Sequence, residues 1–237
     1  MKKIYDIESA PEGRANGISL QLAAKQQQEG LGATLTEEEK NKIIDKAAKA
    51  VADFLDALGV DWKHDPNCRD TPVRVAKSYV NDFWRGRFEP APEITTFPND
   101  EACYDGMVFE GGIPVQSMCS HHLCNISGKA HIAYIPGTQG KVIGLSKLNR
   151  SVYHFSRRAT IQEELTTAIH AAGSKVCEGN QGVAVMIEGT HACVACRGVR
   201  HEGSTMVTSK ISGDFMNESQ TRAEFYAFVN RMKKQND

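Results

Sequence analysis

The sequence lacks long hydrophobic runs, and it lacks an excess of charge of either sign. No apolar stretch approaches the roughly 18 residues that a membrane-spanning helix needs, and no apolar segment follows the two lysines at its start, as a secretory signal would require. The 28 basic residues nearly balance the 29 acidic ones, for a net charge of −1. We therefore expect neither a membrane nor a nucleic acid as a partner, and at most a local basic pocket.

The cysteines do not form the even set that is typical of disulfide-stabilised secreted proteins. The chain has seven of them, and an odd number without a secretory signal indicates free thiols or a metal site in the reducing cytoplasm. Hydrophobic residues make up 41% and charged residues 24% of the chain, which is typical of a globular protein and excludes wholesale disorder.

The N-terminal part of the chain is predicted to be helical. Residues 1–35 carry few large apolar side chains, and we expect them to form a mobile or loosely docked extension. Thr36 and Glu39 have the spacing of a capping box, and the apolar repeat that follows predicts a long helix. A second helix is expected over 70–86, with an irregular, proline-rich crossing over 87–100.

From about residue 103 the apolar period changes to that of strands. Ser127 and Gly128 are expected to supply a hairpin turn. The expected elements are, in chain order, strands at 107–109, 113–118 and 129–135, helices at 146–157 and 161–177, strands at 183–188, 192–199 and 204–211, and a helix at 219–233. This order predicts an α+β domain over 101–237, with an antiparallel sheet and a helix pair, preceded by a helical region over 36–100.

Two clusters of cysteine and histidine lie far apart in the sequence. The first is Cys-Ser-His-His-Leu-Cys at 119–124, and the second is His-Ala-Cys-Val-Ala-Cys at 191–196. Thiolate and imidazole together are typical of zinc, which in catalytic sites takes three protein ligands and keeps one position for water. The clusters therefore predict a zinc site.

The clusters contain more ligands than one such site needs. Cys119, Cys124, Cys193 and Cys196 could form a structural all-cysteine site. Positions three or five apart on a regular strand face opposite sides, however, and this parity argues against that alternative. Buried cysteines without a metal are a second alternative, and a zinc-stabilised binding module is a third.

Several motifs together resemble type I GTP cyclohydrolase. The resemblance extends over roughly 37–233 and rests on these segments: Ser117–Leu123, Ala133–Pro136, Val142–Arg150, Ile161–Glu163, His191–Gly198, Asp70–Ala76 and Thr221–Phe225. It implies a tunnelling-fold (T-fold) domain, a Zn²⁺ site, and conversion of GTP to 7,8-dihydroneopterin triphosphate with release of formate. A nitrile reductase of the same fold, or an enzyme that stops at a formamide or a cyclic phosphate, is the nearest enzymatic alternative.

The resemblance also implies roles for the two clusters. It assigns Cys119, His122 and Cys193 as zinc ligands, and it leaves His121 and His191 for proton transfer. Both assignments agree with the chemistry, because zinc lowers the pKa of bound water to about 7. Imidazole, with an ordinary pKa near roughly 6.5, can both take and give protons near neutrality.

A triphosphate brings about four negative charges, which a nearly neutral chain must meet with local cations. Lys147 and Arg150 lie near a predicted helix start that we expect Ser146 to cap, where exposed N–H groups favour anions. Arg197 follows the second cluster, and Arg74 lies on the second helix. We expect these five residues to bind the phosphates.

Guanine recognition is assigned to Gln162 and Glu163. The two carboxylate oxygens of Glu163 can accept hydrogen bonds from guanine N1–H and the 2-amino group, which adenine cannot offer. The alternative is structural, because Thr160 and Glu163 also have capping-box spacing. The sequence departs from the family pattern nearby, at Ser120, Ala159, Thr160 and Glu164.

The resemblance implies an assembly as well. T-fold subunits close into pentameric rings that stack as a homodecamer, so that active sites lie between subunits. An antiparallel sheet with open edges agrees with this, since such edges are usually paired or covered. The product could serve folate, biopterin or deazaguanine synthesis alike.

Overall fold

The structure is a computed structural model that describes residues 35–100 and 104–234. The predicted N-terminal extension lies outside the described residues except for Leu35, whose side chain is buried. Among the described residues, no helix combines the length and the apolar character that crossing a membrane requires.

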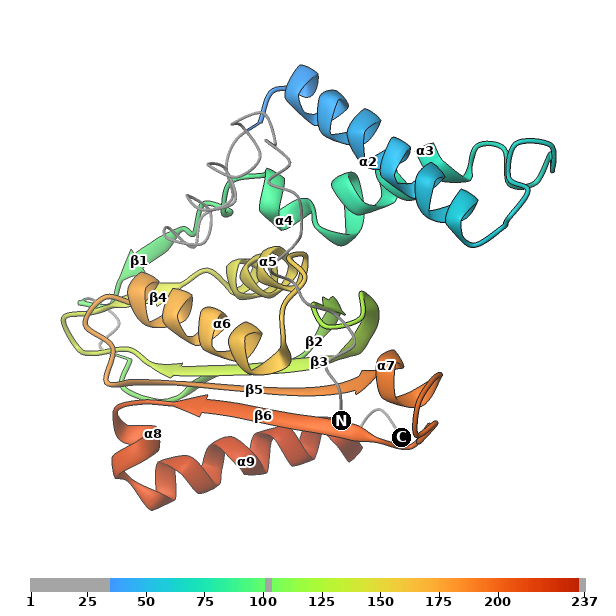
Figure 1. Ribbon diagram of the computed structural model, residues 1–237. Helices are drawn as coiled ribbons and strands as arrows, with labels where there is room; N and C mark the ends of the chain where they lie inside the picture. The colour runs from blue at the N-terminus through green and yellow to red at the C-terminus, as the bar shows by residue number, and fades with distance from the viewer. Residues whose placement is uncertain (1–34, 101–103, 235–237) are drawn as a thin grey trace, which may run out of the picture.

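A four-stranded antiparallel sheet forms the centre of the molecule, in the order β2-β3-β5-β6 (Figure 1). Its strands are β2 (Val108–Cys119), β3 (Cys124–Ile135), β5 (Gly182–His191) and β6 (Thr205–Ile211). Within this chain β2 and β6 are the edge strands.

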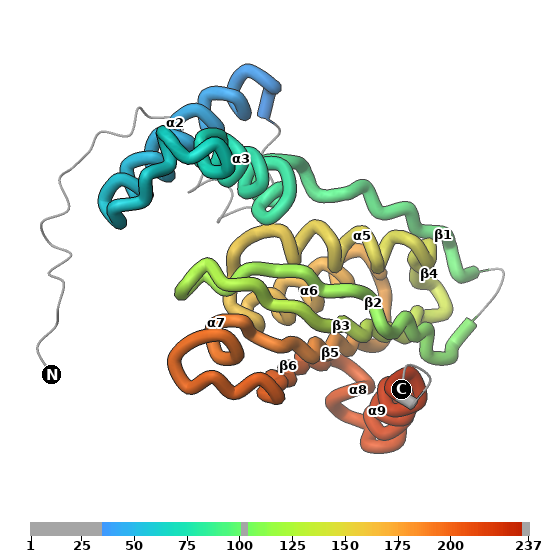
Figure 2. The backbone as a smooth tube through the Cα atoms, turned by 90° about the vertical axis from the view of Figure 1, so that its right-hand side faces the viewer, coloured from blue at the N-terminus to red at the C-terminus, as the bar shows by residue number. Residues whose placement is uncertain are grey.

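Helices cover both faces of the sheet, as Figures 1 and 2 show. Two helices, α5 (Leu145–Ser156) and α6 (Gln162–Val176), lie on one face. The short α8 (Asp214–Asn217) and the C-terminal α9 (Ser219–Lys234) lie on the other. The fold is therefore α+β, as predicted.

The period-two pattern of β5 explains why both faces are covered. Val183, Val185 and Ile187 are fully buried in the core beneath α5 and α6. The intervening Ala184 and Met186 belong to the second core, beneath α8 and α9. Since successive strand residues point to opposite faces, an apolar residue at every position requires a layer of helices on each side.

The N-terminal helices form a smaller unit with its own core. Helix α2 (Glu37–Ala57) begins at the predicted capping box of Thr36 and Glu39. The helix predicted over 70–86 is interrupted. It consists of α3 (Thr71–Ser78), a π-helical segment (Tyr79–Phe83) and α4 (Arg85–Phe88).

A short pairing ties this helical unit to the rest of the chain. The segment 87–100, predicted to be irregular throughout, contains β1 (Thr96–Pro98), which pairs antiparallel with β4 (Lys141–Ile143). The division of the chain at residue 100 stays a prediction.

Three further predictions of local structure were wrong. The hairpin turn lies at 120–123, whereas Ser127 and Gly128 lie inside β3, paired with β2 on one side and β5 on the other. The strands predicted at 107–109 and 113–118 form one strand with an irregularity between Glu110 and Ile113. The third concerns 192–199, where the structure has the helical turn α7 (Ala192–Ala195) and no strand.

Candidate functional site

The sheet brings the two cysteine and histidine clusters together at one end. Cys119 is the last residue of β2 and pairs with Cys124, the first residue of β3. Ile126 of β3 pairs in turn with His191, the last residue of β5. The chain leaves β5 directly into α7, which carries Cys193. Register alone therefore makes two distant segments adjacent.

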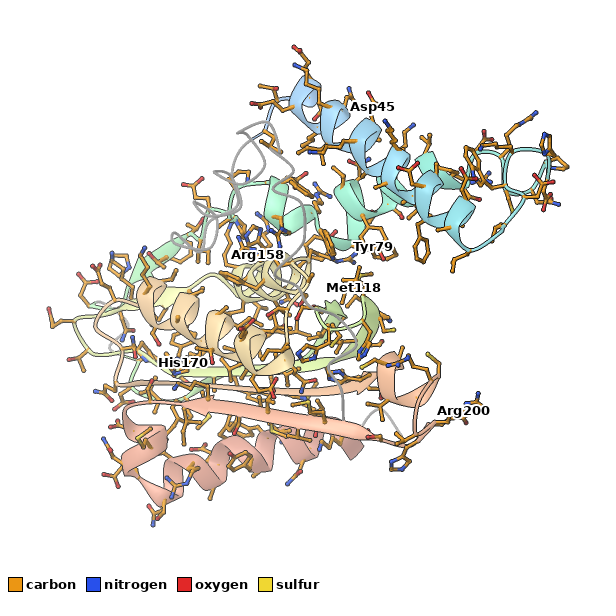
Figure 3. The ribbon with its side chains drawn as sticks, in the orientation of Figure 1. Asp45, Tyr79, Met118, Arg158, His170 and Arg200 are labelled. Carbon is orange, nitrogen blue, oxygen red and sulfur yellow. The ribbon has the colours of Figure 1, made fainter. Side chains whose placement is uncertain are left out.

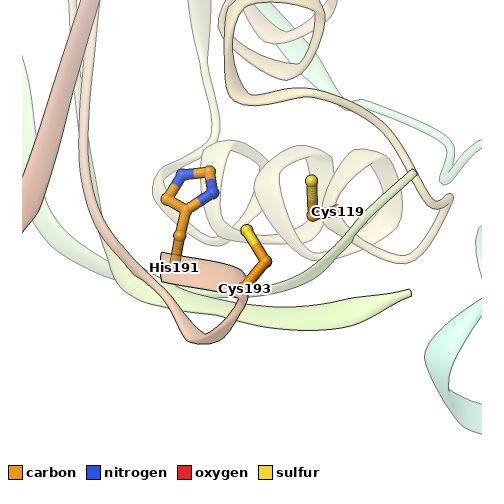
Figure 4. Close-up of side chains that lie close together, drawn as sticks. All are labelled: Cys119, His191 and Cys193. Atoms are coloured by element: carbon orange, nitrogen blue, oxygen red, sulfur yellow. The ribbon is translucent and has the colours of Figure 1, made fainter. Parts of the chain in front are cut away.

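Cys119, His191 and Cys193 form a group that could hold a metal ion, which we call the metal group (Figure 4). One ligand atom from each lies within 4.8 Å of the other two. Cys119 is buried, and the other two side chains are half-buried. Two thiolates and an imidazole are a donor set that zinc favours.

The surroundings of the Cys193 thiol in the metal group disfavour its ionisation. Burial raises the pKa of the Cys193 thiol, and the neighbouring Cys119 raises it further. Two adjacent thiolates are stable only when a cation lies between or beside them, and a bound metal deprotonates such thiols outright. The geometry and the electrostatics of the pair therefore fit a metal site.

The two adjacent histidines lie in the exposed turn between β2 and β3. The Nδ1 atom of His121 lies 3.8 Å from the Sγ atom of Cys119. The imidazole of His122 is not part of the metal group, although its backbone carbonyl accepts a hydrogen bond from the thiol of Cys124. The structure thus unites two of the three predicted ligands, and His122 as the third stays a prediction.

The parity argument against the all-cysteine site was wrong, because neither cluster is a regular strand. The chain reverses at 120–123, where Leu123 has a φ of 54°, and 192–195 is helical. The four thiols nevertheless do not form one group. Cys196 donates to the carbonyl of Ala192 at 2.7 Å, and neither it nor Cys124 belongs to the metal group.

Gln162 holds the imidazole of His191. The Gln162 side chain is fully buried, and its Nε2 atom donates toward the carbonyls of Ile187 and Met206, at 3.1 and 3.0 Å. Carbonyl oxygens only accept, so the other amide atom, Oε1, must face His191. It lies 2.9 Å from the Nε2 atom of His191, and that ring nitrogen must therefore carry the hydrogen.

Two threonines fix the Gln162 amide further. Thr166 donates its hydroxyl hydrogen to the carbonyl of Gln162 at 2.8 Å, so it can only accept from Thr208, 2.7 Å away. Thr208 then has no hydrogen left and accepts from the Gln162 amide at 3.1 Å. The two amide hydrogens of Gln162 are thus shared among three acceptors, two carbonyl oxygens and the Thr208 hydroxyl. Sequence analysis missed both threonines, whose signal was only their polarity within an apolar pattern.

This network gives His191 a defined tautomer. Burial lowers the pKa of His191, although the negative charge of Glu163 raises it in part. With hydrogen on Nε2, the neutral ring keeps its lone pair on Nδ1. The position of the Gln162 amide also favours glycine at 189, because a Cβ atom there would lie 2.7 Å from Oε1 of Gln162.

The start of α6 is anchored to the end of β2. Thr160 pairs with Cys119, and its backbone N–H donates to the carbonyl of Met118 at 3.0 Å. Ala159, just before, has a φ of 44°, in the left-handed region. This anchor places the first turn of α6, with Gln162 and Glu163, beside the metal group.

Glu163 is not a helix cap. Helix α6 begins after Ile161 and has no side-chain cap. The Thr160 hydroxyl lies 3.1 Å from both the Ile161 carbonyl and the Glu164 carboxylate, and it does not contact Glu163. Glu163 itself is exposed, and no hydrogen bond or ion pair with another described residue engages its carboxylate. The predicted capping box was therefore wrong, and the carboxylate is available to a ligand.

The predicted phosphate-binding residues lie in three places. Ser146, Lys147 and Arg150 are in the first half of α5, but Ser146 is not its cap, because the helix begins after Gly144. Arg197 is exposed directly after α7. Arg74 lies on α3, where it donates to a backbone carbonyl at 2.7 Å, and no contact among the described residues joins it to the metal group.

Comparison with known proteins agrees with the motifs. The family model described as GTP cyclohydrolase I matches residues 47–230. A protein of Flavobacterium johnsoniae named GTP cyclohydrolase 1 is 41% identical over 197 residues, which cover 82% of this chain and 84% of the relative. A Sulfurihydrogenibium protein of the same name is 42% identical over 83% of this chain and 98% of its own length. A third, from Photobacterium profundum, is 39% identical over 88% and 95%. The chain belongs to the GTP cyclohydrolase I family.

Proposed function

We propose that this protein opens the imidazole ring of GTP by hydrolysis, releases formate, and forms 7,8-dihydroneopterin triphosphate. The observation that carries this proposal is the metal group, with His191 held in one tautomer and the free carboxylate of Glu163 at the same end of the sheet. A metal site, a proton-transfer group and a guanine-reading group are the three parts that the reaction needs.

The metal is proposed to be zinc, held by Cys119, Cys193 and an imidazole. When bound with an open coordination position, zinc lowers the pKa of water to about 7 and so supplies a nucleophile near neutrality. We propose His122 as the third ligand, as the family resemblance implies. His191 is the alternative third ligand, because one of its ring nitrogens belongs to the same group.

His191 is proposed to move protons during ring opening. Its Nε2–H is engaged by Gln162, so Nδ1 is the atom that can take a proton from an attacking water or give one to a departing guanine nitrogen. His121 lies beside Cys119 and is proposed to assist. Gln162 is fully buried, so we propose that it orients His191 and does not contact guanine directly.

Glu163 is proposed to read the guanine base. The carboxylate has two acceptor oxygens, which match the paired donors N1–H and 2-NH₂ of guanine. Adenine has an acceptor at N1 and no 2-amino group, so it would leave the carboxylate unpaired. This arrangement would select GTP over ATP.

The triphosphate is proposed to bind Ser146, Lys147, Arg150, Arg197 and Arg74. Arg74 lies in the separate helical unit, so a site that includes it could draw it from another copy of the chain. The outer edges of β2 and β6 pair with no other strand among the described residues, so they could pair with another copy of the chain. We therefore propose a homodecamer of two pentameric rings with active sites between subunits.

A reducing compartment, the cytoplasm, is proposed as the location. The six cysteines in the described part of the chain are all free, which agrees with such a compartment. The pathway is proposed to be that of folates and related pterins, since dihydroneopterin triphosphate is their shared precursor.

Incubation with GTP tests the proposed function. We expect formate and, after oxidation, a fluorescent pterin, both in amounts equal to the GTP consumed. A formamide product without formate would show that the reaction stops after ring opening. Neither product from zinc-loaded protein would contradict the proposed function.

A further inference from the structure

A cavity of about 470 Å³ lies between α4, α5 and β2. We call it the arginine cavity, because Arg85 of α4 and Arg150 and Arg157 of α5 and its C-terminal end line it. None of the residues of the metal group takes part in its lining. Helix α4 reaches α5 closely at Gly86, where a Cβ atom would lie 2.2 Å from the carbonyl oxygen of His154.

Negative charge is scarce in the lining of this cavity. Among the described residues that line it, Glu89 is the one carboxylate, and both of its oxygens are engaged. One accepts from Arg85 at 2.5 Å, and the other lies 3.7 Å from the ammonium group of Lys40. Glu89 is therefore not available to Arg150 or Arg157.

Arg157 is only partly satisfied by the protein. Its Nη1 atom lies 3.4 Å from the carbonyl of Asp82, and its guanidinium lies over the ring of Tyr153 at 4.9 Å. Its Nε atom is buried and has no hydrogen-bond partner among residues 35–100 and 104–234. Arg150 is exposed, and no hydrogen bond or ion pair with another described residue engages it. Two cationic groups of the cavity thus have donors to spare.

His154 adds a buried donor to the lining. Only 6% of this residue is exposed, and no hydrogen bond with the described part of the chain engages its Nε2 atom. Burial, and then the positive charge of Arg158, lower its pKa to about 4, so the ring is neutral near pH 7. A neutral imidazole can present an N–H at Nε2. A buried donor without an acceptor is unfavourable, and a ligand acceptor would remove that penalty.

More positive charge lies behind the cavity. Arg158 lies at the junction of α4 and α5 (Figure 3), where its Nε atom donates to the carbonyl of Gly86 at 3.0 Å. Burial lowers the pKa of Arg158, and the charge of Arg87 lowers it further. In a chain with a net charge of −1, this crowding of cations favours an anion in the cavity.

We propose that the arginine cavity binds phosphate groups through Arg150, Arg157 and the Nε2–H of His154. Guanidinium forks match the oxygens of phosphate in bidentate fashion, and a volume of about 470 Å³ accepts more than one phosphate group. The phosphates can come from the triphosphate of the nucleotide, which rests on the proposed function, or from free inorganic phosphate or polyphosphate, which does not.

Calorimetric titration of the full chain with inorganic triphosphate, in phosphate-free buffer, tests the proposal without any turnover. We expect saturable binding that Arg157→Gln weakens at least about tenfold, and that Arg231→Gln does not weaken. The control removes the same charge from an exposed position on α9. No binding by the parent protein, or equal weakening by both variants, would overturn the proposal.

His154→Phe guards against a folding artefact. It removes the unpartnered nitrogen and keeps an aromatic ring beside Phe155, so we expect folding to be retained while triphosphate binding falls about three- to tenfold. Unchanged binding in a folded His154→Phe protein would remove His154 from the proposed site. Unchanged binding in Arg157→Gln as well would overturn the proposal.

GTP then distinguishes the two sources of phosphate. If the cavity holds the triphosphate of the nucleotide, Arg157→Gln raises KM for GTP by about the factor by which it weakens inorganic triphosphate. If the cavity is a separate site, KM in phosphate-free buffer stays unchanged while triphosphate binding is lost. Either result supports a phosphate site, and each remains readable by titration even if the protein does not turn GTP over.

Discussion

The surroundings of the metal group and the arginine cavity differ in whether their polar atoms have hydrogen-bond partners. Around His191, the donors of Gln162, Thr166 and Thr208 all have acceptors, and the Gln162 amide oxygen faces the imidazole. In the arginine cavity, the Nε2 atom of His154 and the Nε atom of Arg157 have no hydrogen-bond partner among the described residues. A reactive group must be held in one orientation before substrate arrives, which requires satisfied partners. A binding cavity keeps its donors open for its ligand.

The largest expected effect comes from removing the thiols of the metal group. We expect Cys119→Ala and Cys193→Ala to abolish both zinc binding and turnover, because each removes one of two thiolates in the metal group. Cys196→Ala, whose thiol lies outside the group, is the matched control. Zinc content by atomic spectroscopy and formate release measure the two effects. Zinc loss in Cys196→Ala, with zinc retained in Cys119→Ala, would contradict the proposed ligand set.

A substitution of Glu163 tests whether its carboxylate recognises the guanine base. Glu163→Gln should lower GTP turnover by at least about 10³-fold, because an amide N–H₂ then faces a guanine donor. Zinc content and melting temperature should stay unchanged, since the carboxylate makes no contact with the described residues that would hold the helix. Glu164→Gln is the neighbouring control. Parent-like turnover in Glu163→Gln would mean that guanine is read elsewhere.

Substitutions of His122 and His191 distinguish a zinc ligand from a proton-transfer residue. His191→Ala should lower turnover by roughly 10²–10⁴, the usual contribution of general acid–base catalysis, and should keep zinc. His122→Ala should lose zinc. The reverse pattern of zinc contents would assign His191 as the third ligand and would leave His122 without the proposed role. Metal analysis of the two variants, side by side, decides between them.

A substitution of Gln162 tests whether its hydrogen bond with His191 orients the His191 imidazole. Gln162→Met keeps the length of the side chain but accepts no bond from the Nε2–H of His191, and we expect a loss of about 10- to 100-fold in kcat with little change in KM. Nitrogen NMR of labelled histidine should show the His191 ring change from one tautomer to a mixture. A purely structural Gln162 would lower stability and leave the tautomer of the surviving folded protein as it was.

The smallest expected effect concerns the stability contributed by His154. Its pKa is about 4 in the folded protein and about 6.5 when unfolded. The unfolded state therefore binds more protons between these values, and stability falls as the pH falls from about 6.5 toward 4. His154→Phe removes this loss. The difference in free energy of unfolding between the variant and the parent protein should therefore shift by about 2 kcal/mol in favour of the variant when the pH falls from 7 to 5.

Urea unfolding at the two pH values measures this difference. His201→Phe, which changes an exposed histidine, is expected to follow the parent protein at both. If His154→Phe keeps the full pH dependence of the parent, then His154 is not buried in its neutral form and the contrast between the two regions weakens.

The most reliable predictions from sequence were those that depend on local periodicity. The capping box at Thr36 and Glu39, the helices α5, α6 and α9, and the strand β5 lie close to their predicted ranges. Predictions failed where a short segment responds to distant neighbours. Ser127 and Gly128 resemble a turn, yet pairing with strands on both sides keeps them extended.

The sequence by itself determined the α+β class, the zinc-type donor set and the family, because apolar period, ligand chemistry and motif order are all local properties of the chain. Only the tertiary structure decided which donors meet. The β3–β5 register brings His191 to the hairpin that carries Cys119, and the packing of α6 across β5 and β6 converts Gln162 from an expected base-binding residue into the partner of His191. Hydrogen bonds act over about 3 Å, so contacts of this kind depend on register and packing that the order of residues does not state.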